Sequence, residues 1–201
     1  ASIDAKILNM VRGTLNTTGS VTVGNAYSQS GGSFNPSGAV AITHSSGNLV
    51  LLNALGGVAS FAATAPAGDV SLPGITSSGN IDVLAGNAIT VNGSLIAAGT
   101  TSLEAQGATG HVSFQPGSGL SANGVAIQAG GNISDANVSG NTLQSSGAVQ
   151  LSAGGAIGTL GNPLRIDAGA NAVSALAASG IALSAPQVTL GAFANTGSGD
   201  I

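Results

Sequence analysis

Two acidic residues, Asp82 and Glu104, have the spacing in this 201-residue chain that most suggests acid–base chemistry. Each follows directly after an apolar residue of a recurring strand pattern, Ile81 in one case and Leu103 in the other. If these strands stack, both carboxylates point outward from one face at about the 5 Å strand spacing. A retaining glycosidase needs two carboxyl groups about 5 to 5.5 Å apart, so the pair could cleave a polysaccharide. No aromatic residue flanks the pair to hold a sugar ring, and the alternative is that both acids serve solubility.

The other polar residues form no catalytic or metal-binding pattern. His44 and His111 belong to different repeats, so we expect them at solvent-facing or turn positions. The chain has no G-x-S-x-G, H-E-x-x-H, P-loop or dinucleotide-binding motif. The calcium-binding nonapeptide is also missing, and we interpret residues 197–200 as a C-terminal turn. We therefore expect no enzyme activity, no catalytic, cofactor-binding or metal-binding residue, and no cofactor.

The composition indicates an ordered chain with little charge. Hydrophobic residues make up 43% and charged residues 5%, which argues against intrinsic disorder. The net charge is −4 and the basic residues are Lys6, Arg12 and Arg165, so no cationic surface is expected for nucleic acid or anionic lipid. No apolar run approaches the roughly 20 residues of a membrane-spanning helix, so we expect no membrane insertion. The absence of cysteine excludes a disulfide framework but leaves the compartment open.

A repeat of short strands must position these residues. Residues 147–157 read Gly-Ala-Val-Gln-Leu-Ser-Ala-Gly-Gly-Ala-Ile, an apolar/polar alternation that paired glycines interrupt. The first apolar residue of this pattern recurs every 19 to 24 residues, at Val21, Val40, Phe61, Ile81, Leu103, Val125 and Val149. A second group of apolar residues falls between these positions, at Leu49/Leu51, Val70/Leu72, Ile89/Val91, Val112/Phe114 and Ile133. Each period therefore contains two or three short strands.

This period predicts an all-β fold, a parallel β-helix in which each strand stacks on its counterpart one turn later. Helical repeats are disfavoured, because glycine costs about 1 kcal/mol at a helix-interior position and the chain contains 33 glycines. The length corresponds to roughly eight to nine turns at the expected strand spacing. We expect glycine or asparagine to supply positive φ at the corners, with the amides of Asn80, Asn87 and Asn132 stacked along the axis.

We interpret residues 1–201 as a single β-helix segment with two irregular regions. Residues 1–20 fit the pattern poorly, and residues 5–11 could form either a short helix or a strand that caps the end. From Val149 to Ile181 the spacing exceeds one turn, so we expect an irregular or expanded turn within residues 152–180.

Residues 147–157 and the following Gly-Thr-Leu-Gly-Asn-Pro-Leu-Arg-Ile-Asp at 158–167 resemble the repeat region of filamentous-haemagglutinin-like exoproteins. These are large adhesins of two-partner secretion systems in Gram-negative bacteria, and the resemblance covers most of residues 37–190 as a pattern. It implies a right-handed β-helix that is secreted or held at the bacterial cell surface as the shaft of an adhesin. It also implies an outer-membrane secretion transporter as partner during export, and a host-cell or matrix glycan or protein as receptor. Residues 35–38 depart from the N-P-N motif of the secretion domain, so we expect an internal shaft segment.

Three functions remain open on the sequence. The first is a structural and adhesive shaft, and the second is a polysaccharide-degrading β-helix enzyme that uses Asp82 and Glu104. The third, an ice-binding solenoid, would present threonines at one repeat position. Thr22, Thr43, Thr90, Thr101 and Thr189 do not share a register, which places this function last.

Overall fold

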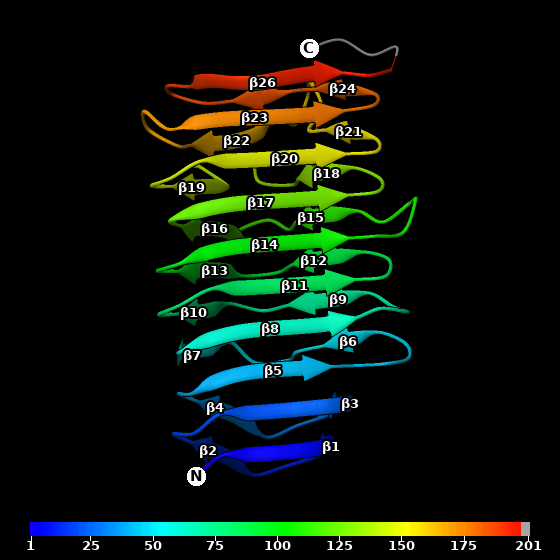
Figure 1. The fold of residues 1–201 in the computed structure, drawn as a ribbon, viewed down its shortest axis with the longest axis vertical. Helices are drawn as coiled ribbons and strands as arrows, with labels where there is room; N and C mark the ends of the chain where they lie inside the picture. Colours follow the sequence, from blue (N-terminus) through cyan, green and yellow to red (C-terminus); the bar gives the residue numbers. More distant parts are fainter. Residues whose placement is uncertain (198–201) are drawn as a thin grey trace.

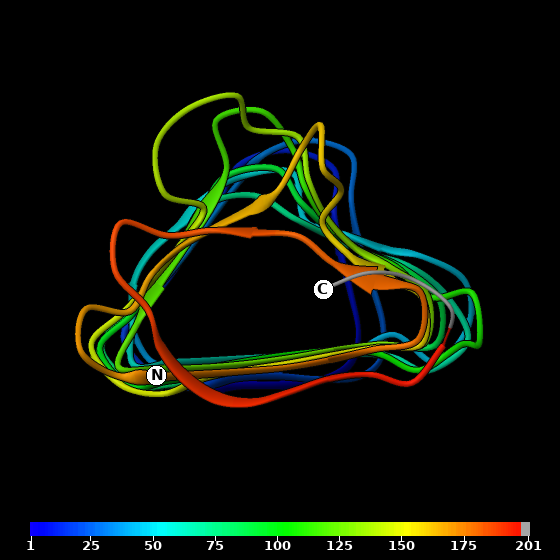
Figure 2. The same ribbon diagram turned by 90° about the horizontal axis from the view of Figure 1, so that it is seen from above.

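The chain forms an all-β parallel solenoid of about nine turns, seen in a computed structural model that describes residues 1–197 (Figure 1). The parallel β-helix predicted from the repeat is therefore confirmed. Viewed along its axis, the stack is a three-sided tube (Figure 2). Buried side chains form one contiguous hydrophobic core inside it. No helix in the described residues is long and apolar enough to cross a membrane. The C-terminal turn expected at residues 197–200 extends outside the described part of the chain.

Three parallel sheets form the sides of the tube, and we call them face 1, face 2 and face 3 in their order along one turn. Face 1 contains β1 (Ile3–Met10), β3 (Val21–Gln29), β5 (Ala39–Thr43), β8 (Ser60–Ala65), β11 (Ile81–Ala85), β14 (Thr100–Ala105), β17 (Gly124–Ala129), β20 (Val149–Ala153), β23 (Ala172–Ala177) and β26 (Thr189–Asn195). Face 2 contains β6 (Leu49–Val50), β9 (Val70–Leu72), β12 (Ile89–Val91), β15 (Val112–Phe114), β18 (Ile133–Asp135), β21 (Ala156–Ile157) and β24 (Gly180–Ile181). Face 3 contains β7 (Leu55–Val58), β10 (Ile75–Ser77), β13 (Ser94–Ala97), β16 (Gly119–Ala122), β19 (Leu143–Ser145), β22 (Leu164–Asp167) and β25 (Leu183–Ser184). In the first turns, β2 (Thr14–Thr17) pairs with β4 (Ser33–Pro36).

Face 1 places its inward side chains in columns along the axis, because stacked parallel strands keep one register. The first column contains Ile81, Val125 and Val149 as predicted, but Thr101 occupies the place expected for Leu103. Leu103 instead lies in the second column, paired with Val83 and Ile127. The prediction was wrong by two residues here because Thr101 breaks the aliphatic pattern on which the spacing was measured.

Thr101 is only 1% exposed, and its Oγ1 has no hydrogen-bond partner among the described residues. A buried hydroxyl without a partner costs about 1 to 3 kcal/mol. We expect Thr101→Val, which keeps the shape and removes the hydroxyl, to raise the free energy of unfolding by about 1 kcal/mol in urea titrations. Thr100→Val, at the exposed neighbouring position, is the matched control and should change it by less than about 0.5 kcal/mol. A lower urea midpoint for Thr101→Val would contradict this prediction.

A third inward column of face 1 consists of alanines at the corner that leads to face 2. Its members are Ala65, Ala85, Ala105, Ala129, Ala153 and Ala177, all paired in register and at most 5% exposed. The residue after the alanine is glycine in several turns, and a Cβ at Gly154 would overlap the carbonyl oxygen of Gly130 in the turn below. The backbone φ of Gly154 is not positive. At Gly154 glycine therefore follows the strand because the turn below approaches too closely for a side chain.

The prediction that the corner asparagines adopt positive φ is wrong. Within residues 1–197 only glycines have positive φ, so Asn80, Asn87 and Asn132 do not. Two of these asparagines accept a hydrogen bond from the backbone of the next turn. The N–H of Thr100 donates to Asn80 Oδ1 at 3.0 Å, and the N–H of Ala156 donates to Asn132 Oδ1 at 2.8 Å. These amides connect successive turns along the axis.

Both regions expected to be irregular belong to the stack, and each carries an irregularity. The pairing of β1 with β3 shifts register between Ala5 and Ile7, and the loop between β21 and β22 contains an isolated bridge between Thr159 and Asn162. Of the two structures considered for residues 5–11, the strand is observed, because β1 spans Ile3–Met10 and pairs in parallel with β3. Val149 is followed in its column by Val173 and not by Ile181, which belongs to face 2. One turn therefore runs from Val149 to Val173, and it contains the loop between β21 and β22.

Tyr27 is the single tyrosine of the chain and is 2% exposed. Its hydroxyl donates to Gln29 Oε1 at 2.9 Å, and burial raises the pKa of Tyr27 to about 12. Because the folded-state pKa lies above the ordinary value of 10.0, this tyrosine contributes its full stabilisation below pH 10 and loses it as the pH rises toward 12.

We expect the free energy of unfolding to fall by about 2 kcal/mol over that range through Tyr27. With no tryptophan present, ultraviolet titration of tyrosinate follows this group alone. Tyr27→Phe is the control and should lack this component of the alkaline destabilisation. Ionisation of Tyr27 near pH 10 would contradict the prediction.

Candidate functional site

The carboxylate pair proposed for catalysis is not in register. Asp82 and Glu104 both lie at outward positions of face 1, but Asp82 pairs with Ser102 and Glu104 pairs with Leu84. Glu104 lines a shallow hollow of about 320 Å³ on this face, and Asp82 does not line it. The two acids are thus diagonal neighbours, and the side-by-side arrangement expected from the sequence is wrong because it depended on the misplaced Leu103.

The two histidines accept backbone hydrogen bonds in separate turns. The N–H of Tyr27 donates to His44 Nδ1 at 3.1 Å, and the N–H of Asn132 donates to His111 Nδ1 at 2.8 Å. His111 is exposed and His44 is half-buried. Within residues 1–197, no group of three or more histidines and acids could hold a metal ion.

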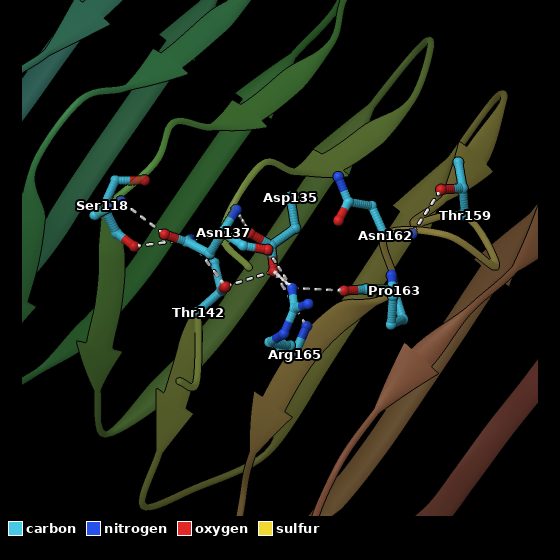
Figure 3. Close-up of polar contacts among 9 residues, drawn as sticks. Ser118, Asp135, Asn137, Thr142, Thr159, Asn162, Pro163 and Arg165 are labelled. Atoms are coloured by element: carbon cyan, nitrogen blue, oxygen red, sulfur yellow. Dashed lines mark hydrogen bonds and ion pairs between the residues drawn. The ribbon is translucent and has the colours of Figure 1, made fainter. Parts of the chain in front are cut away.

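A buried polar network lies where face 2 turns into face 3, and Asp135 is at its centre (Figure 3). Asp135 is in register with Phe114, so a carboxylate occupies a position of the core column. Its side chain has no solvent exposure and accepts hydrogen bonds from Asn137, Thr142 and Arg165. The Arg165 Nη1 to Asp135 Oδ2 distance is 3.3 Å. These donors replace the water that the buried carboxylate has lost.

Arg165 also joins the two loops that project at this corner. Its Nη1 donates to the carbonyl oxygen of Asn137, in the loop between β18 and β19, and to that of Pro163, in the loop between β21 and β22. Asn137 Nδ2 donates in turn to the carbonyl oxygen of Ser118, in the loop of the turn below. The network therefore fixes the base of three successive loops (Figure 3).

Below these loops the outer surface of face 3 is hollowed. One open hollow of about 640 Å³ and another of about 290 Å³ adjoin at Ser121 and Gln144, and we call this hollowed surface the face 3 cleft. Its walls are the loop with Asn141 on one side and the loop of residues 168–171 on the other. Both loops project beyond the stack at the two ends of face 3 (Figure 2, yellow-green and orange).

The floor of the cleft is a row of outward side chains on four successive turns. The row consists of Ile96, Ser121, Gln144 and Asp167, each in register with the next. Asn141 Nδ2 donates to Asp167 Oδ2 at 3.2 Å, which connects the wall to the floor. The side chains of Ser121 and Gln144 make no hydrogen bond among the described residues. Their donors and acceptors are therefore available to a bound molecule.

Sequence reasoning missed both the network and the cleft. Asp135 follows Ile133 by two residues, at the position where the other turns carry Leu72, Val91 or Phe114. The acid at this core position was the feature of the sequence that could have revealed the buried network. Arg165 and Asp167 belong to the 158–167 stretch that carries the family resemblance, but nothing in their spacing indicated that one would stabilise a loop and the other line a cleft.

The fold defines the chain as a parallel β-solenoid repeat protein with a polar cleft on one face. No protein-family profile, curated protein or solved structure matches it.

Proposed function

We propose that this chain is a segment of the shaft of a large exported adhesin of a Gram-negative bacterium. The observation that carries the proposal is the uninterrupted stacking of face 1, whose ten strands run through all of the described turns. In such a solenoid each turn contacts only its neighbours, so stability adds up along the axis and length can increase without a larger core. This is the property that a shaft requires.

The interior of the solenoid supports folding outside the cell. The core is mainly aliphatic and contiguous from Met10 to Ile181, and the chain has no cysteine. Folding of such a stack can begin at any turn and propagate as further turns become available. A chain that passes a transporter in extended form could therefore fold progressively, without disulfides. Residues 147–167 resemble two-partner secretion exoproteins, and this resemblance also supports an outer-membrane transporter as the partner during export.

Surface display tests this proposal. Residues 1–201 are fused behind the secretion domain of a two-partner system and expressed with its transporter in a Gram-negative host. We expect the segment outside the cell, accessible to added protease, and we expect it in the periplasm when the transporter is omitted. Retention in the periplasm with the transporter present, while a known β-helical passenger is exported in parallel, would contradict the proposal.

A further inference from the structure

We infer that the face 3 cleft binds a neutral, extended glycan along the solenoid axis. This inference rests on the proposed function, because it assigns a ligand class to an adhesive segment. Three features of the cleft support it: the chemistry of its lining, its axial spacing and the rigidity of one wall.

Nine of the 20 residues that line the two hollows carry a hydroxyl or amide side chain, and most of the others are alanine or glycine. Asn123, Asn141, Gln144 and Asn171 contribute amides, and Asp167 is the single charged residue among those that line the two hollows. Amides and serine hydroxyls both donate and accept hydrogen bonds, as sugar hydroxyls do. Ile96 is 45% exposed at one end of the floor and offers an apolar contact for the C–H face of a sugar ring.

The charge distribution favours a neutral ligand over an acidic one. None of the residues that line the hollows is basic. Arg165 lines neither hollow, and its Nη1 donates to Asp135 and to two backbone carbonyl oxygens. An acidic polysaccharide would meet the Asp167 carboxylate without a compensating cation, and that contact is unfavourable.

The spacing of the floor suits a linear polymer. Ser121, Gln144 and Asp167 rise by one strand spacing each, about 4.8 Å, along the axis. Each ring of an extended glycan advances by a similar distance, so successive sugars can meet successive side chains. One wall is fixed before binding, since the Asp135 network secures the loop that carries Asn141. A preorganised site loses less conformational entropy when it binds.

Titration with defined oligosaccharides tests the inference. The probes are gluco- and N-acetylgluco-hexaoses, with a galacturonate hexamer as the acidic comparator, followed through the side-chain amide signals in nuclear magnetic resonance spectra. We expect saturable shifts of the Gln144 amide with at least one neutral hexaose, no shift of the Gln150 amide, and weaker binding of the acidic hexamer. Gln144→Ala should weaken binding about fivefold, the value for one lost hydrogen bond. Gln150→Ala is the matched control, because Gln150 lies in the same turn on the outer surface of face 1, and it should leave binding unchanged.

The inference is overturned if no neutral hexaose causes saturable shifts, if the acidic hexamer binds more tightly, or if Gln144→Ala leaves affinity unchanged. Its failure is distinguishable from that of the shaft proposal. A segment that is displayed on the cell but binds no neutral hexaose contradicts only the ligand assignment. A segment that binds in the cleft but is not exported contradicts only the shaft proposal.

Discussion

Asp135→Ala should destabilise the solenoid by about 3 to 5 kcal/mol, the largest effect we expect from a single substitution. The change removes the carboxylate that pairs with Arg165 and accepts hydrogen bonds from Asn137 and Thr142. These donors lie at a buried corner, and Thr142 is 1% exposed, so they would lose their partner without gaining water. Breaking a buried ion pair at one side is costly because the other charge is left uncompensated.

Urea unfolding measures the global loss, and hydrogen exchange measures its location. We expect the exchange protection of residues 136–142 to fall first, because Asp135 and Arg165 fix that loop. Asp82→Ala is the matched control. Asp82 is exposed and makes no side-chain hydrogen bond in the described chain, so its removal should change the free energy of unfolding by less than about 0.5 kcal/mol. Equal stabilities of the two variants would show that the network does not secure this corner.

Leu151→Ala should cost about 2 to 5 kcal/mol, since it opens a cavity in the second inward column of face 1. Leu151 is 3% exposed and is stacked between Ile127 and Ala175. Ala175 is too small to fill the space, and the paired backbones on both sides limit collapse. The loss should therefore lie in the upper part of that range.

The effect of Leu151→Ala should also be local. Because the turns of a solenoid stabilise only their neighbours, we expect reduced hydrogen-exchange protection in β17, β20 and β23 and unchanged protection in β3 and β5. Gln150→Ala, on the outward side of the same strand, is the control and should have nearly wild-type stability. Uniform loss of protection from β3 to β26 would show that the stack unfolds as one cooperative unit.

The fold class was predictable because it depends on a short-range signal that recurs. The alternation in β20 and its repetition at Val125 and Ile81 require only that apolar side chains face inward, and parallel stacking then follows from the period. Where one turn departs from the pattern, the prediction fails. Thr101 at an aliphatic position shifted the register by two residues, and with it the inferred distance between Asp82 and Glu104.

The role of the corner residues depended on contacts between turns. Glycine and asparagine at a strand end suggest a turn with positive φ, because this is their usual local preference. In the solenoid, Gly154 avoids overlap with the carbonyl oxygen of Gly130, and Asn132 accepts a hydrogen bond from Ala156. Both partners are about one turn away in the sequence. A local preference carries no information about such a contact.

The sequence by itself determined the period, the alternation of inward and outward side chains and hence an all-β solenoid of about nine turns. Only the tertiary structure decided which polar residues come together. Asp135 and Arg165 are distant in the chain. They meet at the corner between face 2 and face 3, beside the loop between β18 and β19. Likewise, Ser121, Gln144 and Asp167 form one row because successive turns stack in register. Every turn must bury apolar side chains, so the hydrophobic pattern recurs in every turn. A polar site forms only where a few turns differ from this pattern, and its position depends on the loops of those turns.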